Sequence, residues 1–205
     1  MLYFDFDGTL VDVWQRFYHI FKDASGISGM TLEEYVQVKK QFVRDSDVAH
    51  TFGGVLPEDY WAKKRAMLED PKYLSFDRLL VPAEQIMEFF QAYPCRILTN
   101  RRNAAAFKAQ LTALGLEELC EKCVVLNPDE KITKTQYLHN NHPNEKIVLV
   151  GDAEAEAQAA ELNSVKVYLV RTGLRDARLI PGAEKCHIIE SASDFMNAFK
   201  ENDSL

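Results

Sequence analysis

Short apolar runs rich in β-branched residues recur along the chain, and they predict strands. The apolar positions in these runs do not alternate with polar ones, which is typical of strands buried on both faces of a sheet. About five such strands are expected, at residues 1–5, 95–99, 122–126, 146–150 and 165–170.

Helical patterns separate these strands. Apolar residues with helical spacing run from Ala104 to Leu114, and Gly115 follows as the expected C-terminal cap. Residues 134–140 form a second helical pattern, with Thr133 in front of it as the expected N-cap. Because strands alternate with helices, the sequence predicts an α/β fold with a doubly wound parallel sheet.

Residues 14–80 depart from this alternation, since they contain no convincing strand. Three helices are expected there. The first carries Trp14, Phe17, Tyr18 and Phe21, the second carries Leu32, Tyr35, Val38 and Phe42, and the third opens at Pro57 and carries Trp61 and Leu68. We therefore expect a helical module at 14–80, inserted into an α/β core made of residues 1–13 and 81–205. The tail, 200–205, is expected to be frayed.

Composition and charge narrow the range of partners. The chain has 205 residues, of which 47% are hydrophobic, and a formal net charge of -7. This acidic balance argues against a nucleic-acid partner, because no basic excess exists to neutralise phosphates. No apolar run approaches the roughly 18 residues of a membrane span, and the N-terminus lacks the pattern of a secretory signal. We expect a cytoplasmic protein without a membrane partner.

The four cysteines are scattered along the chain and do not form a disulfide framework. Cys120 and Cys123 form a CxxC pair, but no second pair stands at zinc-ligand spacing. Reduced, partly buried thiols are therefore expected.

Polar side chains follow several of the predicted strands at the point where each strand ends. Asp5 and Asp7 follow the first strand, and Thr99 and Asn100 end the second. Lys131 and Lys134 follow the third strand in the sequence, and Asp152 follows the fourth. Ligands bind to an open parallel sheet at the carboxyl ends of its strands. Carboxylates, a hydroxyl and a lysine at that edge predict a site for a divalent cation and a phosphate. Each residue also has a plainer interpretation, since Asp5 and Asp7 suit a strand end and a turn, and Asp152 suits a helix N-cap.

Three segments resemble motifs of the haloacid dehalogenase (HAD) superfamily of aspartate-nucleophile phosphohydrolases. DFDGT at 5–9 is similar to the first motif, LTN at 98–100 to the second, and VGDAEAEAQAA at 150–160 to the fourth. The order of the motifs and their places after predicted strands agree over nearly the whole chain. The resemblance implies a HAD-like Rossmannoid core, and the helical insertion resembles the C1-type cap of that superfamily.

The resemblance also implies residue roles. Asp5 would be the nucleophile that forms an aspartyl phosphate, and Asp7 the general acid and base. Thr99 would hydrogen-bond the phosphoryl group, with help from backbone N–H groups of Asn100 and of a helix that starts near Arg102. Asn100 and Arg101 are therefore candidate substrate-binding residues. Lys134 would balance the anionic charge, and Lys131 is the alternative.

The metal implied by the resemblance is Mg²⁺, which prefers oxygen ligands. Asp5, Asp152 and the backbone carbonyl of Asp7 would hold it. The second acid of the fourth motif is usually Asp, and this chain has Glu156 at the matching place. Two alternatives remain for the longer side chain of Glu156. It either binds the metal or only lies on the first turn of the helix.

The sequence thus predicts a Mg²⁺-dependent phosphomonoester hydrolase for a small phosphorylated metabolite, similar to phosphoglycolate phosphatases. A sugar-phosphate mutase, another phosphotransferase of the same fold, or a catalytically silent binding protein are the alternatives. Asp7 favours phosphate chemistry, since the dehalogenases of this superfamily lack an acid there. A monomer or a homodimer is expected. Candidate specificity residues in the cap are Trp14, Arg16, Arg44 and His50, although such residues are more often core or solvated.

Overall fold

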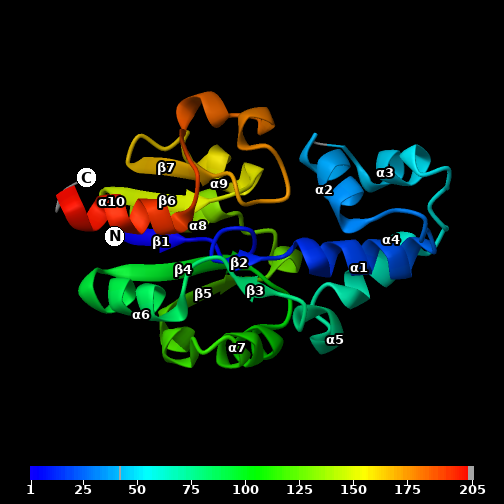
Figure 1. Ribbon diagram of the computed structural model, residues 1–205. Coiled ribbons are helices and arrows are strands. Elements are labelled where there is room, and N and C mark those ends of the chain that lie inside the picture. Colours follow the sequence, from blue (N-terminus) through cyan, green and yellow to red (C-terminus); the bar gives the residue numbers. More distant parts are fainter. Residues whose placement is uncertain (42, 203–205) are drawn as a thin grey trace.

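The computed structural model describes residues 1–41 and 43–202, and a six-stranded sheet lies at its centre (Figure 1). The spatial order of the strands is β5-β4-β1-β6-β7-β8, and every neighbouring pair is parallel. The strands are β1 (Leu2–Phe4), β4 (Cys95–Asn100), β5 (Cys123–Leu126), β6 (Ile147–Gly151), β7 (Val165–Val170) and β8 (His187–Ile189). This arrangement confirms the predicted parallel α/β sheet.

Helices cover both faces of the sheet because successive side chains of a strand point in opposite directions. On β1, the ring of Phe4 contacts Phe89 of α6 (Ala83–Ala92) and Phe195 of α10 (Ala192–Asn202). Its neighbour Tyr3 points to the other face and contacts Tyr137 of α8 (Lys134–Asn141). The same face is covered by α9 (Glu154–Ala159), and α7 (Ala104–Ala113) packs beside β5 and β4. The sheet is therefore doubly wound.

The local signals for two of these helices act as expected. Thr133 caps α8, and its side chain and that of Gln136 bond each other's backbone N–H groups. Gly115 follows α7 with a φ of 74°, the left-handed conformation that ends a helix.

The structure also contains elements that the sequence patterns did not predict. Strand β8 has three residues at the sheet edge, and β2 (Val11–Asp12) pairs antiparallel with β3 (Arg78–Leu79). The short helix α3 (Asp45–Thr51) was not expected either. The helix expected to open at Pro57 begins three residues later, at Tyr60. Phe42 lies outside the described residues, as do 203–205, while residues 200–202 of the tail belong to α10.

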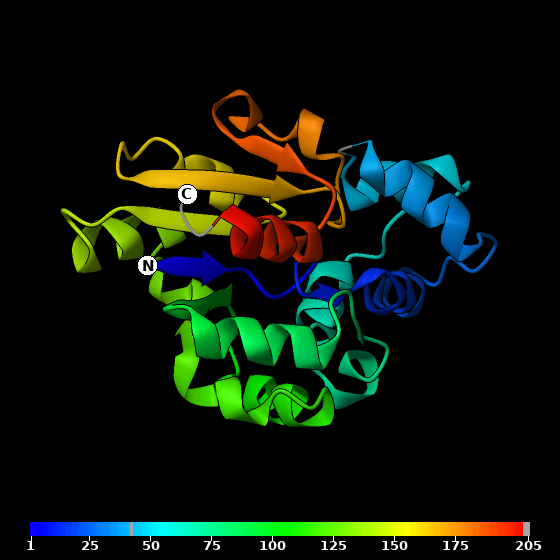
Figure 2. The same cartoon turned by 60° about the vertical axis from the view of Figure 1, so that its left-hand side comes forward.

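Five helices lie between β2 and β3 in the sequence, and four of them, α1–α4, stand beyond the carboxyl ends of the strands in both views (Figures 1 and 2). They are α1 (Trp14–Ser25), α2 (Leu32–Lys40), α3, α4 (Tyr60–Met67) and α5 (Pro71–Leu74). These helices share a core of their own, which includes Phe21, Tyr35 and Tyr60. We propose that residues 14–80 form a cap on the α/β core, with the β2–β3 pair as its stem.

No described helix combines the length and the apolar character that crossing a membrane requires. All four cysteines are free.

Candidate active site

The candidate site lies where β1, β4 and β6 end. β1 is hydrogen-bonded to both β4 and β6, so the residues that follow these three strands are neighbours. Asp5 follows β1, and its backbone N–H donates to the carbonyl of Val150 at 2.8 Å. Asp152 follows β6, and Thr99 lies near the end of β4 with 1% of its surface exposed. The structure therefore brings the predicted motif residues to one edge of the sheet.

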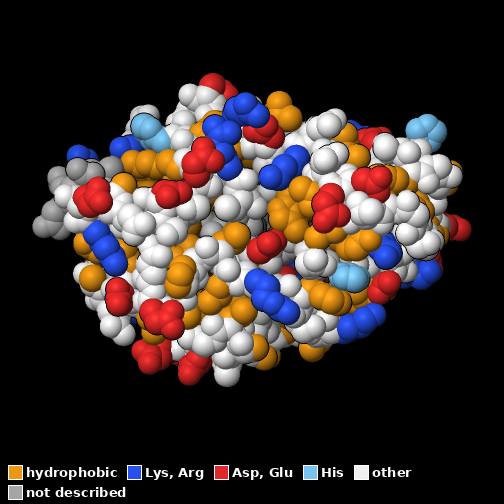
Figure 3. Space-filling model, viewed as in Figure 1, with side chains coloured by type: hydrophobic (Ala, Val, Ile, Leu, Met, Phe, Trp, Pro, Cys, Tyr) orange, Lys and Arg blue, Asp and Glu red, His pale blue; other side chains and the backbone are white. Residues whose placement is uncertain are grey.

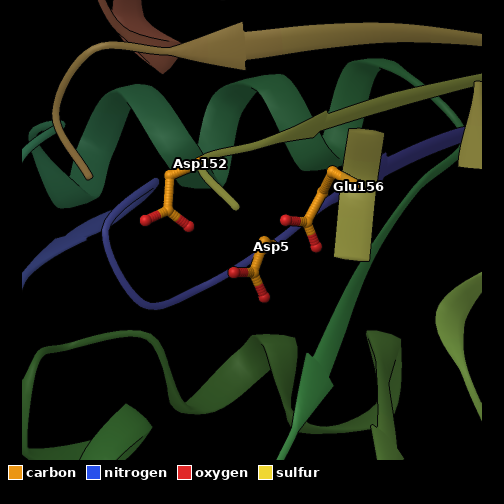
Figure 4. Close-up of side chains that lie close together, drawn as sticks. All are labelled: Asp5, Asp152 and Glu156. Carbon is orange, nitrogen blue, oxygen red and sulfur yellow. The ribbon is translucent and has the colours of Figure 1, made fainter. Parts of the chain in front are cut away.

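Three carboxylates converge at this edge (Figure 4). Asp5, Asp152 and Glu156 are all buried, and each offers an oxygen that lies within 4.8 Å of the others. Burial raises the pKa of Asp5 to about 6, against the opposing effect of Lys134. Burial, Asp5 and Glu156 together raise the pKa of Asp152 well above its usual range. A divalent cation with oxygen ligands fits this group, because it would relieve the repulsion among the carboxylates.

The backbone around Asp152 leaves little room for another side chain. A Cβ atom on Gly8 would lie 2.3 Å from Oδ2 of Asp152, and one on Gly173 would lie 2.2 Å from the same oxygen. Gly8 also has a φ of 74°, which favours glycine. The hydroxyl of Thr172 donates to the carbonyl of Gly8 at 2.6 Å, which joins the loop after β7 to the loop after β1. These contacts hold Asp152 close to the first motif.

Lys134, at the start of α8, lies between two of the three carboxylates. Its Nζ is 2.6 Å from Oδ1 of Asp5 and 2.6 Å from Oε1 of Glu156, and the residue is 2% exposed. Burial alone would lower the pKa of Lys134, but Asp5 and Glu156 raise it above its usual value. Lys131 is exposed and ends a short 3₁₀ turn, with a φ of 58°. Of the two candidate lysines, the structure places Lys134 against Asp5.

Glu156 uses both of its carboxylate oxygens. Oε1 accepts from Lys134, and Oε2 accepts from the backbone N–H of Ala153 at 3.0 Å. The second bond caps the first turn of α9, so the side chain is held by its own helix as well as by Lys134. This arrangement makes Glu156 part of the carboxylate group and also part of the helix start.

Asp7 pairs with two arginines. Its Oδ1 accepts from Arg16 of α1 at 2.6 Å and from Arg101, directly after β4, at 2.7 Å. Burial alone would raise the pKa of Asp7, but Arg101 and Arg16 lower it below its usual value. In this arrangement Asp7 is therefore a carboxylate.

A buried polar ring extends from Asp7. Arg101 donates to Oε1 of Gln110 at 3.1 Å, and Gln110 donates to Oδ2 of Asp77 at 2.6 Å. Nε of Arg16 lies 3.3 Å from Oδ1 of Asp77, which closes the ring back to the cap helix. Burial raises the pKa of Asp77 to about 7. The sequence patterns predicted neither Asp77 nor Gln110, because the contact between them joins two segments that are remote along the chain.

The backbone N–H groups before α7 hold a carboxylate of the cap. Glu69 accepts from the N–H of Arg102 at 2.8 Å and from that of Asn103 at 2.7 Å. The helix expected to start near Arg102 begins at Ala104, with the side chain of Asn103 as its N-cap. The side chain of Asn100 is exposed, whereas Arg101 is buried beside Asp7.

The cap residues singled out in the sequence lie in different places. Arg16 reaches Asp7, as described above. Trp14 lines a separate open groove near Arg171 and Arg178. Arg44 stands at the start of α3, and His50 is exposed.

A cleft beside Asp152 is lined by two cap residues, Lys39 and Lys64. Neither lysine was among the candidates from the sequence.

Comparison with known proteins identifies the family. The model of the family described as haloacid dehalogenase-like hydrolase matches residues 2–170. The chain therefore belongs to this family of hydrolases, and the prediction of an enzyme of this family is confirmed. Among curated proteins, no sequence matches this chain significantly.

Solved structures share the fold over almost the whole chain. A HAD family hydrolase from Deinococcus radiodurans R1, with bound phosphate and sodium, has a TM-score of 0.69 and 15% identity, and covers 98% of this chain and 94% of its own. A protein described as a predicted phosphatase from Clostridium acetobutylicum has a TM-score of 0.67 and 16% identity, and covers 98% and 97%. One described as a predicted phosphoglycolate phosphatase from Haemophilus somnus has a TM-score of 0.61 and 18% identity, and covers 97% and 96%.

Proposed function

We propose that this protein is a Mg²⁺-dependent phosphomonoester hydrolase that acts on a small phosphorylated metabolite through an aspartyl phosphate on Asp5. One observation carries the proposal. The buried carboxylate of Asp5 lies at a strand end, 2.6 Å from Lys134, and shares a cluster of oxygens with Asp152 and Glu156. A nucleophile, a cation and acidic metal ligands at one point are what phosphoryl transfer to a carboxylate requires.

Asp5 and Lys134 would act in the first step. A carboxylate oxygen of Asp5 attacks phosphorus, the bond to the ester oxygen breaks, and the phosphoryl group is left on Asp5. Lys134 keeps Asp5 ionised and offsets charge on the transferring group, since its ammonium lies between Asp5 and Glu156. Thr99 would hydrogen-bond a phosphoryl oxygen from the end of β4.

Asp7 would act as the general acid in the first step and as the general base in the second. In the second step it accepts a proton from the water that attacks the aspartyl phosphate, and Arg16 and Arg101 hold it in the carboxylate form that this step needs. In the first step it must give a proton to the leaving oxygen. Movement of the cap helix that carries Arg16 would remove one positive charge from Asp7 and favour its protonated form.

Asp5, Asp152 and the backbone carbonyl of Asp7 would hold the metal. Mg²⁺ at this point would neutralise part of the carboxylate charge and polarise the phosphoryl group. Glu156 would act on the metal mainly through its bonds to Lys134 and to Ala153, as an outer partner.

The proposal is tested by release of inorganic phosphate from a panel of phosphorylated metabolites, with Mg²⁺ and after removal of divalent cations by chelation. Turnover that depends on Mg²⁺ is the expected result. Turnover that persists after exhaustive chelation contradicts the metal assignment. Turnover only in the presence of a sugar bisphosphate points to the mutase alternative, and no reaction with any ester points to a silent binding protein.

A further inference from the structure

A cleft of about 200 Å³ lies between the cap and the α/β core. Phe17, Lys39 and Lys64 line it from the cap, and Asp152, Glu154 and Arg175 line it from the core. Because Asp152 belongs to the carboxylate group of the candidate site, the cleft reaches that group at Asp152. Its volume is smaller than the roughly 300–1,000 Å³ of pockets for drug-sized ligands, which favours a small substrate.

Two lysines on the cap side of this cleft share one carboxylate. Nζ of Lys39 lies 2.9 Å from Oδ1 of Asp45, and Nζ of Lys64 lies 2.5 Å from Oδ2 of the same residue. The hydroxyl of Tyr60 also donates to Oδ2 of Asp45, at 2.6 Å. Burial alone would raise the pKa of Asp45, but Lys64 and Lys39 lower it to about 2, so Asp45 is ionised and fixes both ammonium groups.

The pair carries more positive charge than Asp45 can balance. Two ammonium groups face one carboxylate, which leaves one positive charge on the cap wall of the cleft. Lys39 donates two hydrogen bonds, one to Oδ1 of Asp45 and one to the carbonyl of Val43. Among the described residues, Lys64 has Asp45 as its hydrogen-bond acceptor, so two of its three N–H groups are left for a ligand.

The charges around the pair favour the binding of an anion. Burial lowers the pKa of Lys39, and Lys64 and Arg175 lower it further by repulsion, against the attraction of Asp45. On the core side, Arg175 is paired with Glu154, so the positive charge is concentrated on the cap wall. Over the face shown in Figure 3, acidic and basic side chains are intermixed, so that face has no broad basic patch to attract an anion. Attraction of an anion to the cleft would come from this local pair of lysines.

We propose that Lys64, supported by Lys39, binds a second anionic group of the substrate. The substrate is then a small phosphomonoester that also carries a carboxylate or a second phosphate, with its phosphoryl end at Asp5 and its other acidic end at the cap. This inference rests on the proposed function, because it names the substrate class of the same site. A charge-assisted hydrogen bond of this kind contributes about 1.5–3 kcal/mol, equivalent to about a 10- to 100-fold preference.

Four compounds with the same three-carbon chain test the proposal. They are propyl phosphate, 3-phosphooxypropanoate, propane-1,3-diyl bisphosphate and 3-aminopropyl phosphate, which differ only in the second group. We expect kcat/KM for the carboxylate or the bisphosphate to exceed that for propyl phosphate by at least about 10-fold. The amine should be the poorest substrate. The order of the carboxylate and the bisphosphate tells which acidic group fits the cleft.

Lys64→Met should lower kcat/KM for the two acidic compounds far more than for propyl phosphate, so that the preference is lost. Lys63→Met is the matched control, because Lys63 directly precedes Lys64 in α4, is exposed, and pairs with Asp59. The control should keep the preference. Lys64→Gln, which can still hydrogen-bond Asp45, serves as a second variant if Lys64→Met melts at a markedly lower temperature.

Equal kcat/KM values for propyl phosphate and both acidic compounds in the unmodified protein would overturn the proposal. An equal loss for all four compounds in Lys64→Met would also overturn it, because that result fits a purely structural lysine. Calorimetric binding of the same compounds in the presence of Mg²⁺ separates this inference from the proposed function. If no compound is hydrolysed but the acidic ones bind more tightly and lose that advantage in Lys64→Met, the hydrolase proposal fails and the anion site stands. If none binds, both fail.

Discussion

Arg16 of the cap helix α1 donates a 2.6 Å hydrogen bond to Asp7 of the α/β core. The same guanidinium lies 3.3 Å from Asp77, so one buried side chain joins two carboxylates across the junction of cap and core. The position of the cap and the ionisation of Asp7 are therefore linked through a single residue.

Arg16→Met should raise the pKa of Asp7, because one of its two cations is removed. For an alkyl phosphate, whose leaving oxygen needs a proton, the alkaline limb of the pH profile of kcat should move to higher pH. The variant should also lose about 3 kcal/mol of stability, since Asp77 is left buried without this cation. Arg65→Met, at an exposed position of α4, is the control. An unchanged pH profile would show that Arg16 does not govern the ionisation of Asp7.

Asp77 should make the protein less stable as the pH rises. Its pKa in the folded state is about 7, above the usual value of 3.8. Between about pH 4 and pH 7 the folded protein retains a proton that the unfolded chain has released, so the free energy of unfolding falls, by at most about 1.4 kcal/mol per pH unit from this group. In Asp77→Asn, urea unfolding at several pH values should show a flatter dependence than in the unmodified protein. An equally steep dependence in both proteins would assign the effect to other groups.

Lys134→Met should lower turnover by at least about 100-fold, because Asp5 and Glu156 lose the cation between them. The variant should also be less stable by about 3–5 kcal/mol, since two buried carboxylates are left unpaired. Assays at a temperature where circular dichroism shows the variant to be folded separate the two effects. Lys131→Met is the matched control and should leave turnover unchanged. A larger loss in the control would make Lys131 the site lysine.

Glu156→Gln should weaken Mg²⁺ binding by about 10- to 100-fold while turnover at saturating metal stays mostly intact. The reason is that both oxygens of Glu156 are already bound to protein groups, so its effect on the metal is indirect. Glu161→Gln, an exposed position beyond α9, is the control. Metal titration of activity measures the effect, with Asp152→Asn for comparison. Equal losses in Glu156→Gln and Asp152→Asn would make Glu156 a direct ligand.

The sequence was sufficient to predict the residues at the strand ends. Asp5, Thr99 and Asp152 each follow an apolar run, and parallel strands bring their carboxyl ends to one edge, so the positions of these residues follow from local patterns alone. Lys134 was also predicted, because KTQYL at 134–138 resembles the lysine-bearing helix start of the superfamily. Thr133 caps the helix at that point.

The contacts between cap and core could not be predicted in this way. Whether Arg16 or Lys64 faces the site depends on how separate helices pack against a sheet, and helical spacing alone does not determine that packing. The ring through Asp77 and Gln110 joins residues 33 positions apart with a single hydrogen bond. The three-residue strand β8 and the two-residue strands β2 and β3 are too short to give a periodic pattern.

In the proposed mechanism, Asp5 is the nucleophile and Asp7 transfers the protons. The most direct measurement is the amount of phosphate bound to the protein after acid quench of a reaction with a phosphate ester whose leaving group needs no proton. Asp5→Asn should give no labelled protein, because an amide neither attacks phosphorus well nor binds Mg²⁺ as a carboxylate does. Asp7→Asn should still be labelled, and its label should persist longer, because water loses its base. Labelling of Asp5→Asn at the level of the unmodified protein would rule out this mechanism, since another residue would then be the nucleophile.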